Sequence, residues 1–278
     1  MKLFPYHCIA LLSTIPLAEG ALTVSDFSTA WTPLVGNFDY LVDQQTGQPE
    51  SDIVGAGINY GMLIGFDDAG SASHTDGDLF FRVRLDKENN GGYNDVMWIG
   101  IDANVDGALD AFLALNTKTN PDEISIHSPG TGLNNSPSTT TIGSGTTIAA
   151  VSSTNYNYRA VTTNDGGDSL DLTPSTSGDT DFYLSFVVPF QTVVNFLAGR
   201  SITITDQSPL RYISATSTNA NALNQDLGGV NDKVDDLTKT WSELGAFSQT
   251  SPTLIPEPSS ALLTLGSLAS ALLLRRRR

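Results

Sequence analysis

Cysteine is almost absent from the sequence, since Cys8 is the only one in 278 residues. Because Cys8 lies in the apolar N-terminal stretch, the rest of the chain cannot form a disulfide or a cysteine-ligated metal site. The preceding residues, Pro5 to His7, lack the small and aliphatic run that bacterial lipoprotein processing needs. Stability must therefore come from an ordinary hydrophobic core or from bound ions.

Basic residues are scarce between the two ends of the chain. The formal net charge is −16, from 14 Lys and Arg against 30 Asp and Glu. Without Lys2, Glu19 and Arg275 to Arg278, residues 22 to 257 keep 9 basic and 29 acidic side chains, a net of −20. Such a body repels nucleic acid and anionic lipid, and it suits divalent cations or uncharged or cationic polymers.

The N-terminal residues show the pattern of a secretory signal peptide. Lys2 gives a positive start, Ile9 to Leu17 form a short apolar run, and Ala18-Glu19-Gly20 offers small residues at the spacing of a cleavage site. A buried helix is the alternative, but Pro16 and the short run count against it. We therefore predict a signal peptide at residues 1–20.

The C-terminal residues combine three ordered features. Pro256-Glu257-Pro258 comes first, and Ala261 to Leu274 follow without a charge. The third feature is a run of four arginines, Arg275, Arg276, Arg277 and Arg278. Fourteen helical residues cover ~21 Å, against a hydrocarbon core of ~30 Å. The segment is therefore a marginal single membrane helix, better suited to sorting than to permanent anchoring, with its arginines on the cytoplasmic side.

This arrangement of residues 256–278 resembles the PEP-CTERM sorting signal of Gram-negative bacteria. The resemblance implies that an exosortase, a membrane-embedded cysteine transpeptidase, recognises Pro256, Glu257 and Pro258 and cuts near them. It also implies release to, or attachment at, the outer surface of bacteria that often make exopolysaccharide. The expected partners are therefore the general secretion machinery, the exosortase and exopolysaccharide, with a transient stay in the inner membrane. An ordinary tail-anchored helix is the alternative.

Between the ends, short β-rich stretches alternate with turn residues, which is typical of strands. Leu79 to Leu85 is the clearest example, with Leu79, Phe81, Val83 and Leu85 on one face and a mixed face opposite. The other predicted strands are Val96 to Ile101, Ala111 to Leu115, Glu123 to Ile126, Tyr156 to Val161, Phe182 to Val188 and Ser201 to Thr205. The pattern predicts an all-β fold, an antiparallel β-sandwich of jelly-roll or Ig-like type.

The rest of the body is assigned to helices, a loop and a linker. Phe190 to Leu197 and Lys233 to Leu244 are the two predicted short helices. Ser128 to Thr154, rich in Ser, Thr and Gly, is predicted to be a long loop or a poorly ordered edge hairpin. We expect a single β-sandwich domain over residues 21–248, a linker over 249–255 and the sorting segment over 256–278.

The central features resemble sandwich domains related to family 9 carbohydrate-binding modules and DOMON domains. In those domains a Phe-Arg-Val-Arg-type strand precedes an aspartate-rich turn and a later Phe-x-Val-Pro strand. The matching residues here are Asp78 to Leu85, Asp102 to Asp110 and Phe186 to Pro189. The chain shows no diagnostic haem ligand.

One constellation points to a metal ion. Residues 102–110 follow the pattern D-x-N-x-D-G-x-x-D, in which Asp102, Asn104, Asp106 and Asp110 supply the hard oxygens that Ca²⁺ prefers. Leu113 replaces the bidentate glutamate of an EF-hand, so we predict instead a structural calcium site in a β-turn. The alternative is an Asx-rich turn without a metal, because Asn, Asp and Gly favour tight turns.

Other chemistry-bearing residues have simpler explanations. His74 and His127 have no neighbouring carboxylate or serine motif, so surface positions are expected rather than a base or a zinc ligand. Trp31, Trp98 and Trp241 are expected in the core rather than on a sugar-binding face. We therefore predict a non-catalytic surface or matrix protein. A carbohydrate-binding module is the alternative, and a glycan-active enzyme ranks last.

Overall fold

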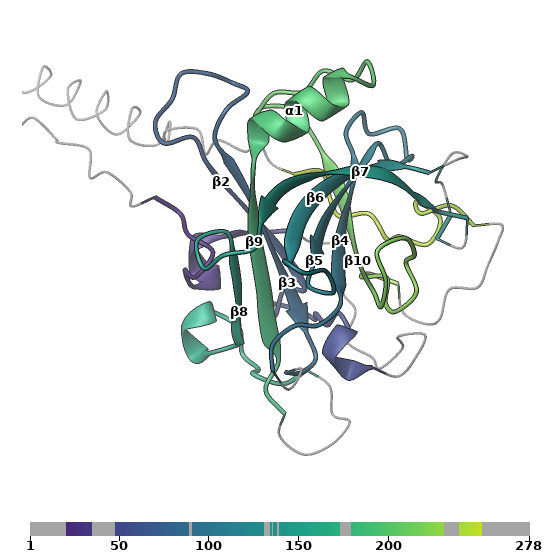
Figure 1. The fold of residues 1–278 in the computed structure, drawn as a ribbon. Coiled ribbons are helices and arrows are strands. Elements are labelled where there is room, and N and C mark those ends of the chain that lie inside the picture. The colour runs from purple at the N-terminus through teal and green to yellow at the C-terminus, as the bar shows by residue number, and fades with distance from the viewer. Residues whose placement is uncertain are drawn as a thin grey trace, which may run out of the picture.

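The computed structural model describes residues 21–34, 48–88, 91–130, 134, 136–137, 139–172, 179–230 and 239–251. Two antiparallel sheets of five strands each make up most of the described chain (Figure 1). The first sheet has the order β1 (Thr32–Pro33), β2 (Met62–Asp67), β3 (Asp78–Leu85), β9 (Phe182–Pro189) and β8 (Tyr156–Ala160). The second has the order β10 (Arg211–Ser217), β4 (Val96–Asp102), β5 (Ala111–Asn116), β6 (Glu123–Pro129) and β7 (Ile142–Ala150).

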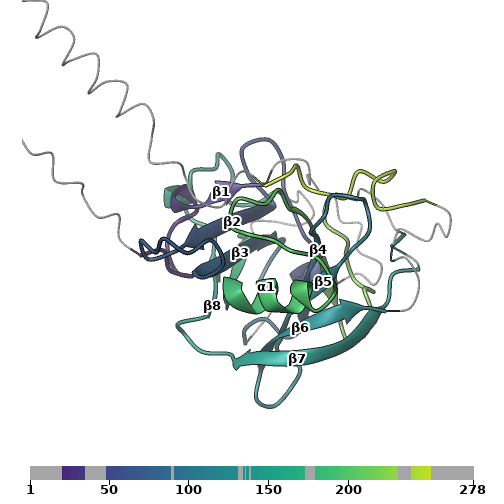
Figure 2. The ribbon, with the colours of Figure 1, turned by 90° about the horizontal axis from the view of Figure 1, so that it is seen from above.

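Helices are few in the described residues. They are α1 (Phe190–Ala198) and the three 3₁₀ turns η1 (Ser28–Ala30), η2 (Pro49–Ser51) and η3 (Thr163–Asp165). Helix α1 confirms the predicted helix, and it buries Phe190, Val193, Val194 and Leu197 at the spacing of one helix face. The helix follows β9 directly and lies against one end of the sheets (Figure 2).

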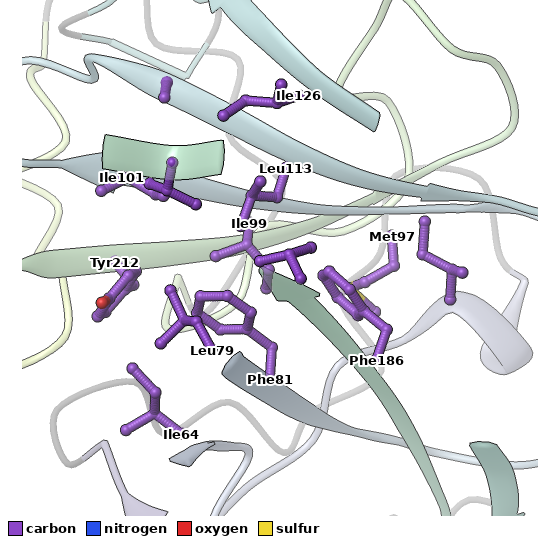
Figure 3. Packing of buried hydrophobic residues seen from close by; sticks show 14 of the residues in the cluster. Ile64, Leu79, Phe81, Met97, Ile99, Ile101, Leu113, Ile126, Phe186 and Tyr212 are labelled. Carbon is purple, nitrogen blue, oxygen red and sulfur yellow. The ribbon is translucent and has the colours of Figure 1, made fainter. Parts of the chain in front are cut away.

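The main core lies between the two sheets (Figure 3). Because successive strand residues point to opposite faces, Leu79 and Phe81 of β3 meet Ile99 of β4 and Tyr212 of β10 there. The Phe81 ring lies 5.4 Å from the Tyr212 ring and 5.6 Å from the Phe186 ring, centroid to centroid. The predicted β-rich, antiparallel two-sheet class is confirmed.

Both outer faces of the sheets are also covered, by segments from opposite ends of the described chain. Val24 and Trp31 pack on Phe80 of β3, and Trp241 and Phe247 belong to a cluster with Trp98 of β4. The predicted mixed face of β3 is therefore buried as well, and its side chains Arg82 and Arg84 are both 0% exposed.

Most predicted strands are confirmed. β3, β4, β5, β6, β8 and β9 coincide with six predictions to within a few residues. The edge-hairpin alternative for Ser128 to Thr154 is also confirmed, because β7 pairs with β6 at the end of its sheet. Strands β1, β2 and β10 were not predicted.

One predicted strand is wrong, and one predicted helix is absent from the part of it that the structure describes. Ser201 to Thr205 forms no strand, because this segment closes α1: Ser201 has a left-handed φ of 65°, and the Ile202 amide donates to the Leu197 carbonyl at 3.0 Å. Residues 239–244, the described part of the predicted Lys233 to Leu244 helix, contain a turn and no helix. Residues 231–238 lie outside the described residues.

The end segments carry predictions that fall outside the described chain. The signal peptide (1–20) and the sorting segment (256–278) are both among them. The predicted sorting residues that lie there are Pro256, Glu257, Pro258, Arg275, Arg276, Arg277 and Arg278. Within the described residues, no helix is both long enough and apolar enough to cross a membrane. At the C-terminal side, the Ser251 amide donates to the Leu210 carbonyl at 2.7 Å.

Candidate functional site

The aspartate-rich loop lies where the sequence places it, between β4 and β5. Asp102 is the last residue of β4, and β5 begins at Ala111, whose partner across the strand pair is Ile101. The chain reverses through two residues with left-handed backbone, Val105 (φ 61°) and Gly107 (φ 95°). Glycine adopts such a φ without a steric penalty, so the D-G step of the motif makes the turn.

The predicted ligands of this loop all accept hydrogen bonds from its own backbone. Asp102 accepts from the Asp106 and Gly107 amides at 3.1 and 3.0 Å, and Asn104 accepts from the Asp106 amide at 3.1 Å. Asp106 accepts from the Ala108 amide, and Asp110 from the Ala103 amide, both at 2.8 Å. These contacts are the ones an Asx-rich turn requires.

Asp102 has, in addition, a cationic partner from another strand. Its Oδ2 accepts from Nε of Arg211 on β10 at 3.1 Å, and Nη2 of Arg211 binds the same oxygen. The Arg211 guanidinium carbon also lies 4.6 Å from the Phe247 ring centroid. A guanidinium thus already neutralises the most buried carboxylate of the loop. The pKa of Asp110, by contrast, is raised, first by burial and only partly offset by the Ala103 amide.

A second acidic cluster, which the sequence did not indicate, lies where β3 ends and β9 begins. One carboxylate oxygen from each of Asp86, Asp171 and Asp181 lies within 4.8 Å of the other two. Among the described residues, this is the only group of three or more His, Cys, Asp or Glu side chains that meets this distance. Asp86 follows β3 and Asp181 precedes β9, and the pairing of Leu85 with Phe182 brings them together.

Arg84 provides the nearest positive charge to this cluster. Its Nε donates to Oδ2 of Asp181 at 2.5 Å, and its Nη2 donates to the Ser169 carbonyl at 3.0 Å. Both side chains of the Arg84–Asp181 pair are 0% exposed. A buried pair of this kind depends on both members, because either one alone would be an uncompensated charge out of water.

Two carboxyl groups of the cluster, those of Asp86 and Asp181, lie in an environment that favours protonation. Burial, with repulsion from Asp181 and Asp171, raises the pKa of Asp86 to about 7. Burial likewise raises the pKa of Asp181 to about 6, although Arg84 works against the shift. Three converging carboxylates are suited to a hard cation or to shared protons, and Arg84 competes with either for Asp181.

A third charged group fastens the N-terminal segment to the outer face of the first sheet. Nη1 and Nη2 of Arg159 donate to the two carboxylate oxygens of Asp165 at 2.8 and 2.6 Å, and the Ser28 amide donates to the same carboxylate at 2.9 Å. Burial raises the pKa of Asp165, but these hydrogen bonds outweigh it and hold the pKa well below the usual range. Arg82 lies 4.1 Å from the Trp31 ring centroid.

The two histidines of the body acquire partners that the sequence did not indicate. Nδ1 of His74, an exposed side chain as expected, lies 3.0 Å from Oδ1 of the buried Asp206. His127 is half-buried rather than exposed, and its Nε2 lies 2.9 Å from Oγ of Ser125, two residues away on the same strand face. Ser125 is only 3% exposed, so this pair lacks the access that a nucleophile needs.

The tryptophans are in the core, as predicted. Trp31, Trp98 and Trp241 are 5%, 0% and 0% exposed. Phe27 is the one aromatic residue among the exposed large hydrophobic side chains of the described chain, and the Arg159 guanidinium carbon lies 5.5 Å from its ring centroid. The described residues therefore present no row of exposed aromatics for stacking on sugar rings.

Comparison with known proteins finds no matching family model, no similar curated protein and no similar solved structure.

Proposed function

We propose that this chain is an exported, non-catalytic surface protein whose β-sandwich body, of jelly-roll or Ig-like type, is delivered by an N-terminal signal peptide and sorted by its C-terminal segment. Its expected final location is the cell surface or the extracellular matrix. The exosortase and the general secretion machinery are its proposed processing partners, and exopolysaccharide is its proposed interaction partner outside the cell.

The observation that carries the proposal is the order of features at the two ends. A positively charged start, an apolar run and small residues open the chain, while Pro256-Glu257-Pro258, an apolar run and Arg275 to Arg278 come last. Lys2 and the arginines at the two extremities are expected to stay on the cytoplasmic side of the inner membrane. The acidic body between the two apolar segments would then lie on the opposite side. The absence of cysteine after Cys8 suits a body whose stability does not depend on the redox state of its surroundings.

The intact mass of the protein recovered from the producing cells tests this topology. We expect a mature chain that begins near residue 21 and ends near Pro258. Glu257→Ala is expected to leave the C-terminal segment uncut, whereas Ser259→Ala, two residues further on, should be processed like the wild type. A wild-type mass equal to that of all 278 residues, in protein recovered from the cytosol, would overturn the proposal.

The proposal includes a structural Ca²⁺ ion at Asp102, Asn104, Asp106 and Asp110. Its support is the sequence pattern D-x-N-x-D-G-x-x-D, which puts four oxygen-bearing side chains on one turn. The carboxylate oxygens of Asp102, Asp106 and Asp110 do not all lie within 4.8 Å of one another, so binding would have to draw them together. The ion would have to compete with Arg211 for Asp102 and with the backbone amides for the other three, so weak binding is expected. The bound ion would brace the β4–β5 hairpin and would have no catalytic role.

A thermal melt with and without calcium tests this site. Excess Ca²⁺ should raise the melting temperature of the wild type, because a ligand that binds only the folded state stabilises it. Asp106→Ala should abolish this increase, whereas Asp86→Asn, in the separate acidic cluster, should keep it. If the calcium-dependent increase in melting temperature disappears in Asp86→Asn and persists in Asp106→Ala, the ion binds at the cluster of Asp86, Asp171 and Asp181 instead. No increase in the wild type would leave the loop as a metal-free turn.

A further inference from the structure

Strand β7 differs from the other edges of the two sheets. The sheet edges are formed by β1 and β8 in the first sheet and by β10 and β7 in the second. Unpaired edges are templates for pairing with another chain, and proteins usually protect them by short strands, proline, charge or a covering segment. Three of these four edges have such protection.

The free side of β10 is covered by later parts of the chain. The Gly228 amide donates to the Ser214 carbonyl at 2.9 Å, and the Ser248 amide donates to the Tyr212 carbonyl at 2.8 Å. Strand β1 has only two residues, and one of them is Pro33. Strand β8 has five residues and carries Arg159.

Within the described residues, strand β7 has none of these four protections, although register irregularities with β6 flank its central residues. It has nine residues, with neither proline nor a charged side chain, and each of them is exposed or half-exposed. Within the described chain it pairs only with β6, and Figure 2 shows it at the margin of the molecule. From Gly145 to Thr147 the pairing with β6 is regular, with irregularities only on either side. This central stretch is therefore a straight template for another strand.

The charge distribution makes the same edge distinctive. Between Glu123 and Arg159 the sequence contains no Lys, Arg, Asp or Glu, although residues 22 to 257 carry a net charge of −20. Two such acidic bodies repel each other over most of their surfaces, because like charges resist close approach. At the β7 edge, two copies can meet with no charged side chain on either pairing strand, and the carboxylate of Glu123 on β6 is held by a hydrogen bond from Oγ1 of Thr147 at 2.8 Å.

We propose that β7 is a self-association edge, at which two copies of this chain pair their β7 strands antiparallel and join their second sheets into one. Antiparallel pairing of identical strands satisfies a two-fold axis, so each copy presents the same residues to the other. The main-chain amides and carbonyls supply the binding, as in other cases of strand addition. The pairing does not depend on export or sorting, and it therefore stands apart from the proposed function.

Charged variants at Ser144 and Thr146 test the pairing. Both side chains are exposed, so the fold should tolerate a change there. The molar mass of the full chain in detergent is measured by light scattering for the wild type, for Ser144→Lys/Thr146→Lys and for Ser144→Glu/Thr146→Glu. We expect a dimer for the wild type and a twofold lower mass for each double variant alone. An equimolar mixture of the two variants should recover the dimer, because opposite charges then face each other.

A control separates this effect from contributions of the apolar ends, which all variants share. Thr32→Lys places the same new charge on the exposed position of edge strand β1 and should leave the dimer intact. A monomeric wild type at about 100 μM, well above the dissociation constants typical of specific pairs, would overturn the proposal. So would a dimer whose mass is unchanged in both double variants. A monomer whose β7 variants differ only in retention on a neutral polysaccharide would instead assign the edge to a glycan.

Discussion

Asp181→Ala is expected to lower the free energy of unfolding by about 3 to 5 kcal/mol, because it leaves the guanidinium of Arg84 buried without its carboxylate. Asp181 and Arg84 are both fully buried, and Nη1 of Arg84 already has no hydrogen-bond partner in the described structure. For a body of this size the loss corresponds to a fall in the melting temperature of roughly 10 °C. Urea unfolding followed by circular dichroism at pH 7.5 measures it.

Asp179→Ala is the matched control for this prediction. Asp179 lies 3.7 Å from Lys87, but its side chain is 56% exposed, and exposed ion pairs contribute little. We expect a change below about 0.5 kcal/mol. The double variant Arg84→Met/Asp181→Leu should recover much of the loss, because it removes the charge together with its partner. Equal losses for Asp179→Ala and Asp181→Ala would show that burial of the pair is not the cause.

The stability of the protein is expected to fall as the pH rises from about 4 to 7. The pKa of Asp86 (about 7) and that of Asp181 (about 6) lie above the value of 3.8 for an unperturbed carboxyl. The folded state therefore holds protons that the unfolded state releases at lower pH. The stabilisation is complete below about pH 4 and is lost as the pH passes through these raised values. Burial is the main cause of the raised pKa of Asp86; the charged groups that act on it are Asp181, Asp171 and Asp179, which raise the pKa, and Lys87, which lowers it.

The pKa of Asp86 lies about 3 units and that of Asp181 about 2 units above the unperturbed value, which at about 1.4 kcal/mol per unit corresponds to an expected loss of several kcal/mol over this range. The midpoints of urea unfolding at closely spaced pH values measure it. Asp86→Asn should flatten the curve between pH 4 and 7, because the amide keeps the shape of the side chain without its proton. Asp68→Asn, at a carboxylate outside the cluster, should leave the slope unchanged. A wild-type free energy of unfolding that rises steadily over this range would contradict the raised pKa values of Asp86 and Asp181.

The sequence pattern, rather than burial, decided which strands could be predicted. Leu79 to Leu85 alternates apolar with mixed residues and forms β3, although both of its faces are buried. Met62 to Asp67 forms β2 but shows no such alternation in sequence. Arg211 to Ser217 was missed for a related reason, since its small polar side chains are buried by a later segment. Ser201 to Thr205 shows alternating isoleucines, but its amides complete the end of α1.

The two acidic sites also differ in how far the sequence alone predicts them. The position of the Asp102 to Asp110 turn was predictable, because the motif and its glycine are contiguous in sequence. Its partner Arg211 was not, since it is 109 residues away from Asp102 and reaches the turn only through the pairing of β10 with β4. The Asp86, Asp171 and Asp181 cluster depends on the register of β3 with β9, which no local pattern specifies.

The cover of the second sheet also sets an order of events during biogenesis. A nascent chain emerges from its N-terminus, and Trp98 and Phe112 become available long before Trp241 and Phe247, which pack into the same cluster. Until those last residues have emerged, the apolar side chains on one face of β4 and β5 remain exposed to solvent. The second sheet therefore cannot bury this face until the C-terminal part of the body has been synthesised.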